Sequence, residues 1–195
     1  MHLLKECESI ALSQERQIIG FNCGNDDLNE FFNRDAVKYQ EQLMCQTYFF
    51  RHNETGKAVC AFSLSADSLK AAWLPGSRRK KVKELIPREK DLQSYPAFLI
   101  GRLGVAVEFG SQGTGTQLMD FIKNLCFDRY PNLARFLLVD AYNDPAVLQY
   151  YRKNGFVTVF SVEEQERDYY KRPDGTEPLR TRFMYYDMKQ WKNKG

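Results

Sequence analysis

The sequence predicts one α/β domain in which helices flank a β-sheet. The chain has 195 residues, of which 43% are hydrophobic and 27% charged, and its net charge is +3. These values are typical of a globular domain that can bury a core without disulfides or a metal. Short runs of β-forming residues alternate with segments of helical periodicity. No repeat or linker divides the chain, so we expect residues 1–195 to form a single domain.

The first half of the chain predicts an amphipathic helix followed by a hairpin. Apolar residues recur with helical spacing over residues 27–44, and Asp27 and Glu30 are spaced like a capping box at the start of this helix. Residues 47–51 and 57–66 are rich in β-forming residues, with turn-like residues between them. We therefore expect two neighbouring strands of the core here.

A basic run covers residues 76–90. Its cations are Arg78, Arg79, Lys80, Lys81, Lys83, Arg88 and Lys90. Such a run usually forms a solvated face. The alternative is a phosphate-binding surface, because clustered cations bind polyanions by releasing counterions. A net charge of +3 does not decide between the two.

A strand, a glycine loop and a helix follow in that order. Residues 97–107 form a near-continuous apolar run, which is typical of a strand covered on both faces, so we expect the centre of the sheet here. The loop reads EFGSQGTG, and helical spacing then continues until Pro131 stops it.

The last part of the chain predicts three more strands and one more helix. Residues 134–141 read as a buried strand. Asp144 and Pro145 then supply the N-cap and first-turn proline of a helix that Gly155 ends. The two final strands are expected at residues 156–160 and 181–188, with a charged stretch up to Gly175 between them.

The glycine loop has the features of a phosphate site. A loop that leaves a buried strand and opens a helix presents backbone N–H groups at the positive end of the helix dipole. Gly113 and Gly115 let the main chain approach a ligand closely. A P-loop would carry Lys where this chain has Thr116, and a dinucleotide fingerprint would carry glycine where it has Leu118. Both of those nucleotide sites are therefore excluded.

Composition removes several other classes of protein. The five cysteines have no CxxC spacing, and the two histidines are His2 and His52, so we expect reduced thiols, no metal and no histidine-based catalysis. No apolar stretch approaches the about 20 residues of a transmembrane helix. The charged start lacks the apolar run of a signal peptide, and we expect a cytoplasmic protein.

The order of these parts resembles the GNAT acetyltransferase superfamily. The matching parts are Leu103-Gly104-Val105, Gln112-Gly113-Thr114-Gly115, the strand of residues 137–141, and the segment YRKNGF from Tyr151 to Phe156. The resemblance covers residues 98–160 clearly and the rest more loosely. It implies a mixed sheet splayed open between the strand ending near Val105 and that ending near Ala141, with acetyl-CoA wedged in the gap.

The resemblance also assigns roles to residues. Tyr151, four residues before Gly155, takes the place of the family's acid, and a phenol of pKa about 10 suits a thiolate whose conjugate acid has a pKa of about 8.5. A backbone N–H near Val105 would polarise the thioester carbonyl. The residues implied to bind acetyl-CoA are Leu103, Val105, Gln112, Gly113, Thr114, Gly115 and Thr116. The chain departs from the family at Gly110, usually Arg or Gln, and at Val147, usually a small residue.

The residues present favour an acceptor amine of low pKa. At pH 7 an α-amino group of pKa about 7.7 is roughly one-sixth neutral, whereas a lysine of pKa about 10.4 is neutral about once in 2,500 molecules. A lysine acceptor therefore needs a good base. Glu108 is the nearest acidic candidate after the strand, and it could equally be a surface residue.

A narrower resemblance lies near the start of the chain. The segment FNCGNDDLNEFFNRDAVKYQ, residues 21–40, with TYFF and AFSLSAD after it, resembles the branch of the superfamily that contains toxins acetylating aminoacyl-tRNA. Cys23-Gly24 matches the Cys-Gly or Ser-Gly pair of that branch.

This second resemblance implies partners. It implies charged tRNA as acceptor and a small antitoxin as protein partner, with a homodimer as in many relatives. The cations that would contact the tRNA phosphates are Arg78, Arg79, Lys80, Lys81 and Lys83. The alternatives are an enzyme acting on a small amine or a protein N-terminus, and a coenzyme A-binding module without transfer activity.

Overall fold

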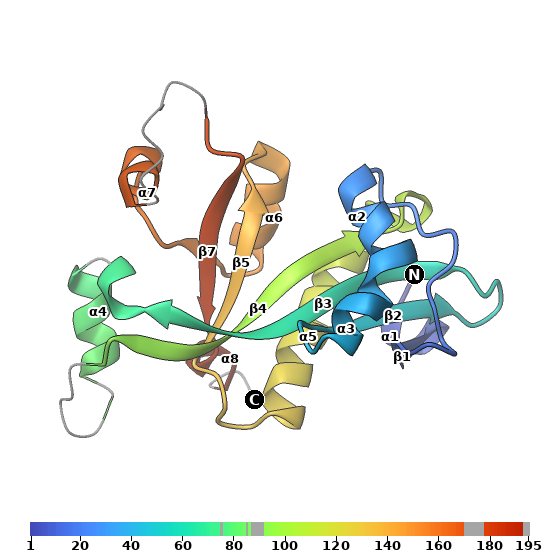
Figure 1. The fold of residues 1–195 in the computed structure, drawn as a ribbon, viewed down its shortest axis with the longest axis horizontal. Coiled ribbons are helices and arrows are strands. Elements are labelled where there is room, and N and C mark those ends of the chain that lie inside the picture. Colours follow the sequence, from blue (N-terminus) through green and yellow to red (C-terminus); the bar gives the residue numbers. More distant parts are fainter. Residues whose placement is uncertain (75, 85, 87–91, 170–177, 193–195) are drawn as a thin grey trace. The chain divides into compact units, whose positions relative to one another are not determined.

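The computed structural model describes residues 1–74, 76–84, 86, 92–169 and 178–192. Seven strands form one sheet in the order β1-β2-β3-β4-β5-β7-β6 (Figure 1). The pairs β1–β2, β2–β3, β5–β7 and β6–β7 are antiparallel. The neighbours β4 and β5 are joined through a helix, which is the connection of a parallel pair. The predicted α/β fold with a mixed sheet is confirmed, and β4 is its central strand.

The chain divides into two compact units. Unit 1 comprises Met1–Ala66 and Ile100–Arg129, and unit 2 comprises Asp67–Leu99 and Tyr130–Gly195. Strands β3 (Ala58–Lys70) and β4 (Ser94–Val105) each contribute residues to both units. A single domain over residues 1–195 stays a prediction.

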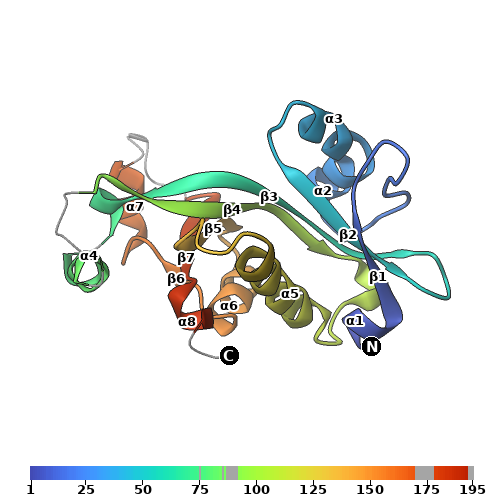
Figure 2. The same ribbon diagram turned by 90° about the horizontal axis from the view of Figure 1, so that it is seen from below.

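Unit 1 places helices on both faces of its part of the sheet. Besides its portions of β3 and β4 it contains α1 (Leu3–Glu6), β1 (Cys7–Ala11), α2 (Asp26–Glu30), the π-helical turn η1 (Phe31–Asp35), α3 (Ala36–Glu41), β2 (Gln46–His52), the 3-10 turn η3 (Val107–Phe109) and α5 (Thr114–Arg129). Figure 2 shows α2 and α3 on one face of β2 and β3, and α5 on the other.

Two aromatic clusters hold these layers together. On the face covered by α2 and α3, Phe32 lies edge-on against Phe21 and Phe31, with 5.3 Å between ring centroids in each pair, and these rings pack in one cluster with Phe49 of β2. On the opposite face, the Phe121 ring of α5 lies 4.8 Å from that of Phe50. Burying a large apolar side chain contributes about 1.5–3 kcal/mol. The two clusters therefore fix α2–α3 and α5 to the strands between them.

The predicted helix of residues 27–44 is present as α2, η1 and α3, but its start is different. Asn25 is the N-cap, because its Oδ1 accepts a hydrogen bond from the N–H of Leu28 at 3.1 Å. The expected capping box at Asp27 and Glu30 is therefore wrong, since these residues already lie inside the first turns. The predicted hairpin is confirmed, with Phe50 opposite Cys60.

Unit 2 contains the remaining strands and helices. Besides its portions of β3 and β4 it contains the 3-10 turn η2 (Ala71–Trp73), α4 (Gly76–Lys83), β5 (Phe136–Tyr142), α6 (Pro145–Lys153), β6 (Val157–Thr158), α7 (Glu163–Tyr169), β7 (Thr181–Asp187) and α8 (Lys189–Lys192). Val139 of β5 pairs with Met184 of β7, which in turn pairs with Thr158 of β6. The predicted strands are confirmed, although β6 is shorter than the expected residues 156–160.

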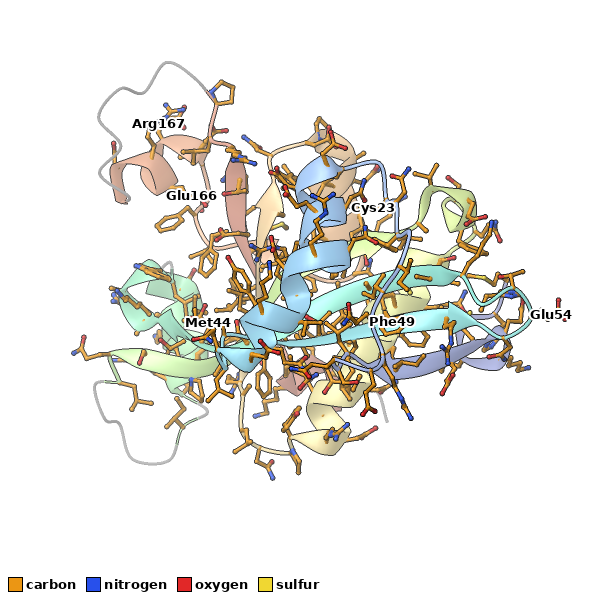
Figure 3. The ribbon with its side chains drawn as sticks, turned by 45° about the vertical axis from the view of Figure 1, so that its right-hand side comes forward. Cys23, Met44, Phe49, Glu54, Glu166 and Arg167 are labelled. Atoms are coloured by element: carbon orange, nitrogen blue, oxygen red, sulfur yellow. The ribbon has the colours of Figure 1, made fainter. Side chains whose placement is uncertain are left out.

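Helix α7 is attached to β7 by a buried ion pair. Glu166 is fully buried, and its two carboxylate oxygens accept hydrogen bonds from Arg182 Nε and from the backbone N–H of Phe183, both at 2.6 Å. Glu163 accepts from the N–H of Leu179, and this hydrogen bond lowers the pKa of its carboxyl group. Figure 3 labels Glu166 and Arg167 on this helix.

The basic run forms helix α4 over its first eight residues. Val82 is buried in the core of unit 2, whereas Arg79 and Lys80 are exposed. Arg88, Lys90 and Gly175 lie outside the described residues, as do the side chains of Arg78 and Lys81. None of the helices within the described ranges has the length and hydropathy needed to cross a membrane.

Candidate active site

The predicted phosphate loop connects η3 with α5 in unit 1. Thr114 is buried, and its hydroxyl donates a hydrogen bond to the carbonyl of Phe109 at 2.9 Å, which closes the loop. Gly113 has a φ of +76°, and a Cβ added there would meet no atom within 4 Å. The N–H groups from Gly113 to Thr116 lie at the positive end of a 16-residue helix. An open, main-chain-lined turn of this kind fits the diphosphate of coenzyme A.

The loop also accounts for glycine at position 110. The N–H of Gly110 donates to the carbonyl of Val107 at 3.1 Å, and a Cβ on Gly110 would lie 3.2 Å from that same carbonyl oxygen. A side chain at this position would therefore require the Val107 carbonyl to shift by a few tenths of an ångström.

Gly101 and Arg102 of β4 come just before the predicted donor-binding residues. A Cβ on Gly101 would lie 3.3 Å from Ser63 Oγ, and the Arg102 guanidinium lies 4.5 Å from the centroid of Phe31. Ser63 follows Ala61 by two residues in β3, and Ala61 packs in one cluster with Phe31, so both neighbours lie on the face covered by α2.

The N–H groups at the end of β4 alternate between its two edges. The N–H of Ala106 donates to the carbonyl of Val59 in β3 at 2.8 Å. Because successive residues of a strand direct their N–H groups to opposite edges, those of Leu103 and Val105 face away from β3. Both residues are half-buried and Gly101 is exposed, so the expectation of a strand covered on both faces is only partly met. This edge can present N–H donors to a thioester.

The Cys23-Gly24 pair lies against the same end of β4. A Cβ on Gly104 would lie 3.1 Å from Cys23 Sγ, and the N–H of Val107 donates to the carbonyl of Asn22 at 3.0 Å. Burial raises the pKa of the Cys23 thiol, which keeps it neutral. Figure 3 shows Cys23 in the loop that leads into α2. The chain before α2 therefore forms a wall beside Val105.

Glu108, the candidate base, is engaged elsewhere. Its carboxylate accepts a hydrogen bond from Lys57 Nζ at 2.7 Å, and both side chains are about half exposed. The ring of His52 stacks on Phe109 next to this pair, with centroids 6.0 Å apart. The geometry favours the interpretation of Glu108 as a surface residue. In the ranges that the structure describes, no group of three His, Cys, Asp or Glu side chains could hold a metal ion.

Tyr151 lies in unit 2, on helix α6. Its side chain is buried between the rings of Tyr150 and Phe156, at centroid distances of 5.0 and 5.4 Å. Burial raises the pKa of the phenol, so it stays protonated at neutral pH. Asp144 starts the helix as predicted, since its Oδ1 accepts from Ala146 N–H at 2.9 Å.

Gly155 fixes the chain just after Tyr151. It has a φ of +85°, and a Cβ added to it would lie 2.9 Å from Tyr186 Cε2. The carbonyl of Tyr151 accepts a hydrogen bond from Phe156 N–H at 3.0 Å. Glycine is required at this turn both for its backbone angle and for its close approach to β7.

The predicted site residues divide between the units. All the residues expected to bind acetyl-CoA, from Leu103 to Thr116, lie in unit 1, whereas Tyr151 and the cations of α4 belong to unit 2. The sequence reasoning missed the asparagines at positions 22, 29 and 33, which hold the chain before α2. The four-residue spacing of Asn25, Asn29 and Asn33 was the available signal, because it puts them on one helical face.

The fold and this site define a class of enzyme. The model of the acetyltransferase (GNAT) family matches residues 5–156, so the chain belongs to this family of acetyl-CoA-dependent N-acetyltransferases.

Solved structures of two proteins of this fold resemble it closely over their whole length. The chain is similar to a tyrosine-to-phenylalanine mutant of KacT, with 16% identity, a TM-score of 0.76 and coverage of 98% of this chain and 100% of the other. AtaT complexed with acetyl-methionyl-tRNAfMet gives 18% identity, a TM-score of 0.74 and coverage of 97% and 99%. AtaTR bound with AcCoA gives 16% identity, a TM-score of 0.71 and coverage of 97% of this chain and 98% of the other.

Proposed function

We propose that this enzyme acetylates the α-amine of an aminoacyl-tRNA, with acetyl-CoA as donor, and acts as the toxin of a toxin–antitoxin pair. The observation that carries the proposal is the contact of Cys23 with the end of β4. It joins the Cys-Gly pair typical of the tRNA-acetylating branch to the strand edge that would hold the thioester.

The donor side of the reaction needs only main-chain groups. The N–H groups from Gly113 to Thr116 would bind the diphosphate, and the N–H of Val105 would donate a hydrogen bond to the carbonyl oxygen as negative charge develops on it. Acetyl-CoA supplies the acetyl group as a thioester. Removing one such donor from an acyl-transfer site costs on the order of 10²–10³ in turnover.

Tyr151 would protonate the departing thiolate. Burial raises the pKa of its phenol, which holds the proton in place before transfer. Burial raises the pKa of the departing thiol for the same reason when the thiolate leaves into a site without water. The pKa values of the phenol and of the thiol therefore rise together. Tyr151 then needs no second acid.

The acceptor side favours an amine that is partly neutral without help. Glu108 is held by Lys57, and the ring of His52 is stacked on Phe109, just after the end of β4. An α-amine of pKa about 7.7 meets this condition, whereas a lysine does not. AtaT was solved with acetyl-methionyl-tRNAfMet, and this likeness of fold agrees with the same acceptor class here.

Helix α4 would supply the phosphate contacts. Arg79 and Lys80 are exposed on the helix while Val82 anchors it in the core, so the cations are presented outward. A tyrosine-to-phenylalanine mutant of AtaT was solved bound to the C-terminus of the antitoxin AtaR. We expect a small antitoxin for this chain too, a homodimer as in many relatives, and action in the cytoplasm, where charged tRNA is found.

The test is direct acetylation of charged tRNA. The protein is mixed with labelled acetyl-CoA and each aminoacylated isoacceptor in turn, with uncharged tRNA and free amino acids as controls. Label should appear on the aminoacyl group of at least one isoacceptor and on neither control. If no isoacceptor is labelled while amino-acid esters or small amines are, the tRNA substrate is wrong and the enzyme acts on another amine.

A further inference from the structure

The chain before α2 is held in place by side-chain amides. Asn29 Oδ1 accepts a hydrogen bond from Cys23 N–H at 2.8 Å, and Asn22 Oδ1 accepts from Gly24 N–H at 2.9 Å. Asn29 Nδ2 donates to the same Asn22 Oδ1 at 3.1 Å. One small network therefore fixes both backbone N–H groups of the Cys23-Gly24 pair.

Asn33 extends this network one turn further along the helix. Its Oδ1 accepts from Phe21 N–H at 2.9 Å, and its Nδ2 donates to the carbonyls of Phe21 at 2.8 Å and Asn29 at 2.7 Å. Asn33 lies in the π-helical turn η1, and such turns interrupt the regular hydrogen bonds of a helix. The side chain thus binds both main-chain groups of Phe21 and a helix carbonyl together.

The held segment lies where an acceptor must approach. Residues 21–24 contact Gly104 and Val107, on the face of β4 that α2 covers, whereas α5 and its phosphate loop lie on the other face. A donor bound at α5 occupies that other face. The amine has to reach the same carbonyl from a direction that the donor leaves open, and residues 21–24 border that direction.

We propose that Asn22, Asn29 and Asn33 are positioning residues that fix residues 21–24 as the acceptor wall of the site. The proposal rests on the proposed function only in taking the reaction to be acetyl transfer to an amine. None of the three asparagines touches the reacting atoms; they act through the main chain of residues 21–24. A misplacement of about 1 Å at such a wall costs on the order of 10²-fold in rate.

The test compares three Asn-to-Asp variants. Asn33→Asp loses both donated hydrogen bonds and brings a carboxylate against two carbonyl oxygens, whereas Asn29→Asp keeps the acceptor for Cys23 N–H. Asn53→Asp makes the same charge change on the exposed β2–β3 turn and serves as control. Asn22→Ala, at an exposed position, removes the acceptor for Gly24 N–H without touching the core and decides the question should Asn33→Asp fail to fold.

Initial rates are measured with charged tRNA and, separately, with amino-acid methyl esters, and coenzyme A affinity is measured by calorimetry. In Asn33→Asp and Asn22→Ala, kcat/KM for the acceptor should fall about tenfold or more, with coenzyme A affinity and the rate of Asn53→Asp unchanged. An equal loss of coenzyme A affinity, or unchanged acceptor kinetics, overturns the proposal. If wild type acetylates the esters but no tRNA, the tRNA substrate fails while the ester rates still decide the role of the asparagines.

Discussion

The phenol of Tyr151 is buried among aromatic rings, and the backbone carbonyl of Tyr151 accepts a hydrogen bond from the N–H of Phe156. Tyr151→Phe keeps the ring and removes only the proton donor. We expect kcat to fall on the order of 10²-fold, which is the usual contribution of a general acid, with coenzyme A affinity nearly unchanged. Thiol release and calorimetry measure the two quantities, with Tyr150→Phe as the neighbouring control. A matching loss of affinity would make Tyr151 a structural residue.

The same burial predicts the shape of the pH profile. Since the pKa of Tyr151 is raised above its ordinary value of about 10, the phenol stays protonated over the neutral and mildly alkaline range. The acceptor α-amine loses its proton near pH 7.7, so kcat/KM should rise through about that pH and then stay level to about pH 10. Rates with an amino-acid ester give the profile. A falling limb centred below pH 9 would contradict the assignment of Tyr151 as the acid.

Alanine substitutions at Gly155 and Gly56 distinguish the cost of backbone strain from the cost of a steric clash. Both have positive φ, at +85° and +71°, but a Cβ meets Tyr186 at 2.9 Å in Gly155 and nothing within 4 Å in Gly56. Gly56→Ala should cost about 1 kcal/mol from the backbone alone. Gly155→Ala should cost about 1–3 kcal/mol more, because overpacking adds to the strain. Denaturant unfolding of both variants gives the difference, and equal losses would show that Tyr186 moves aside freely.

Single residues also show where sequence reasoning stops. Asn25, Asp26 and Asp27 can all cap a helix, so composition does not select among them. The structure selects Asn25 because its backbone is extended, with a φ of −127° and a ψ of 117°. The contacts of Asn22 with Gly24 and Asn29 depend on a loop conformation that spacing does not encode.

At the scale of elements, α7 depends on one buried charge pair. Glu166→Ala leaves the Arg182 guanidinium buried without its carboxylate, which typically costs about 3–5 kcal/mol. Glu164→Ala, on the exposed side of the same helix, should change stability by less than about 0.5 kcal/mol. Thermal or denaturant unfolding of the two variants tests this. If both variants lose a similarly small amount of unfolding free energy, then water hydrates the Arg182 guanidinium once Glu166 is removed.

Elements with long, regular patterns could be predicted, and short ones could not. The 16 residues of α5 have a helical period, and β4 and β5 are apolar runs of seven or more residues. Helix α1 and strand β1 together span nine residues, from Leu3 to Ala11, and were not expected because so short a segment shows no period. Helix α7 lies in a segment whose sequence shows only a charged stretch, because nothing in the sequence distinguishes the buried Glu166 from a solvated residue.

At the scale of the whole molecule, the substrate decides the response to salt. If Arg79 and Lys80 contact tRNA phosphates, replacing both by Ala should reduce the slope of log affinity against log salt by about two, because each contact contributes about one. Lys5→Ala with Lys189→Ala removes two exposed cations elsewhere as control. Filter binding of charged tRNA over a salt series measures the slopes. A shallow wild-type slope, unaffected by either pair, favours a small amine as acceptor.

The order of parts along the chain was enough to predict the fold and the family. Strand, glycine loop, helix and strand appear in the structure as β4, the 110–113 loop, α5 and β5, and the Tyr-x-x-x-Gly-Phe segment begins in α6. The direction of the N–H groups of Leu103 and Val105 was beyond reach, because it depends on which edge of β4 bonds to β3. An apolar pattern shows which face of the sheet a side chain lies on, and it does not show which edge the N–H group faces.

Asn33 illustrates how little chemical freedom a site wall can have. Its side-chain amide bonds to the Phe21 backbone as the peptide group of a neighbouring strand would. The amide oxygen accepts from the Phe21 N–H, and the amide nitrogen donates to the Phe21 carbonyl. Aspartate lacks the donor, glutamine is longer by a methylene, and serine has one hydroxyl group in place of the separate amide oxygen and nitrogen. We therefore expect that, in saturation mutagenesis of position 33, only variants with asparagine keep full activity, although this side chain does not contact the reacting atoms.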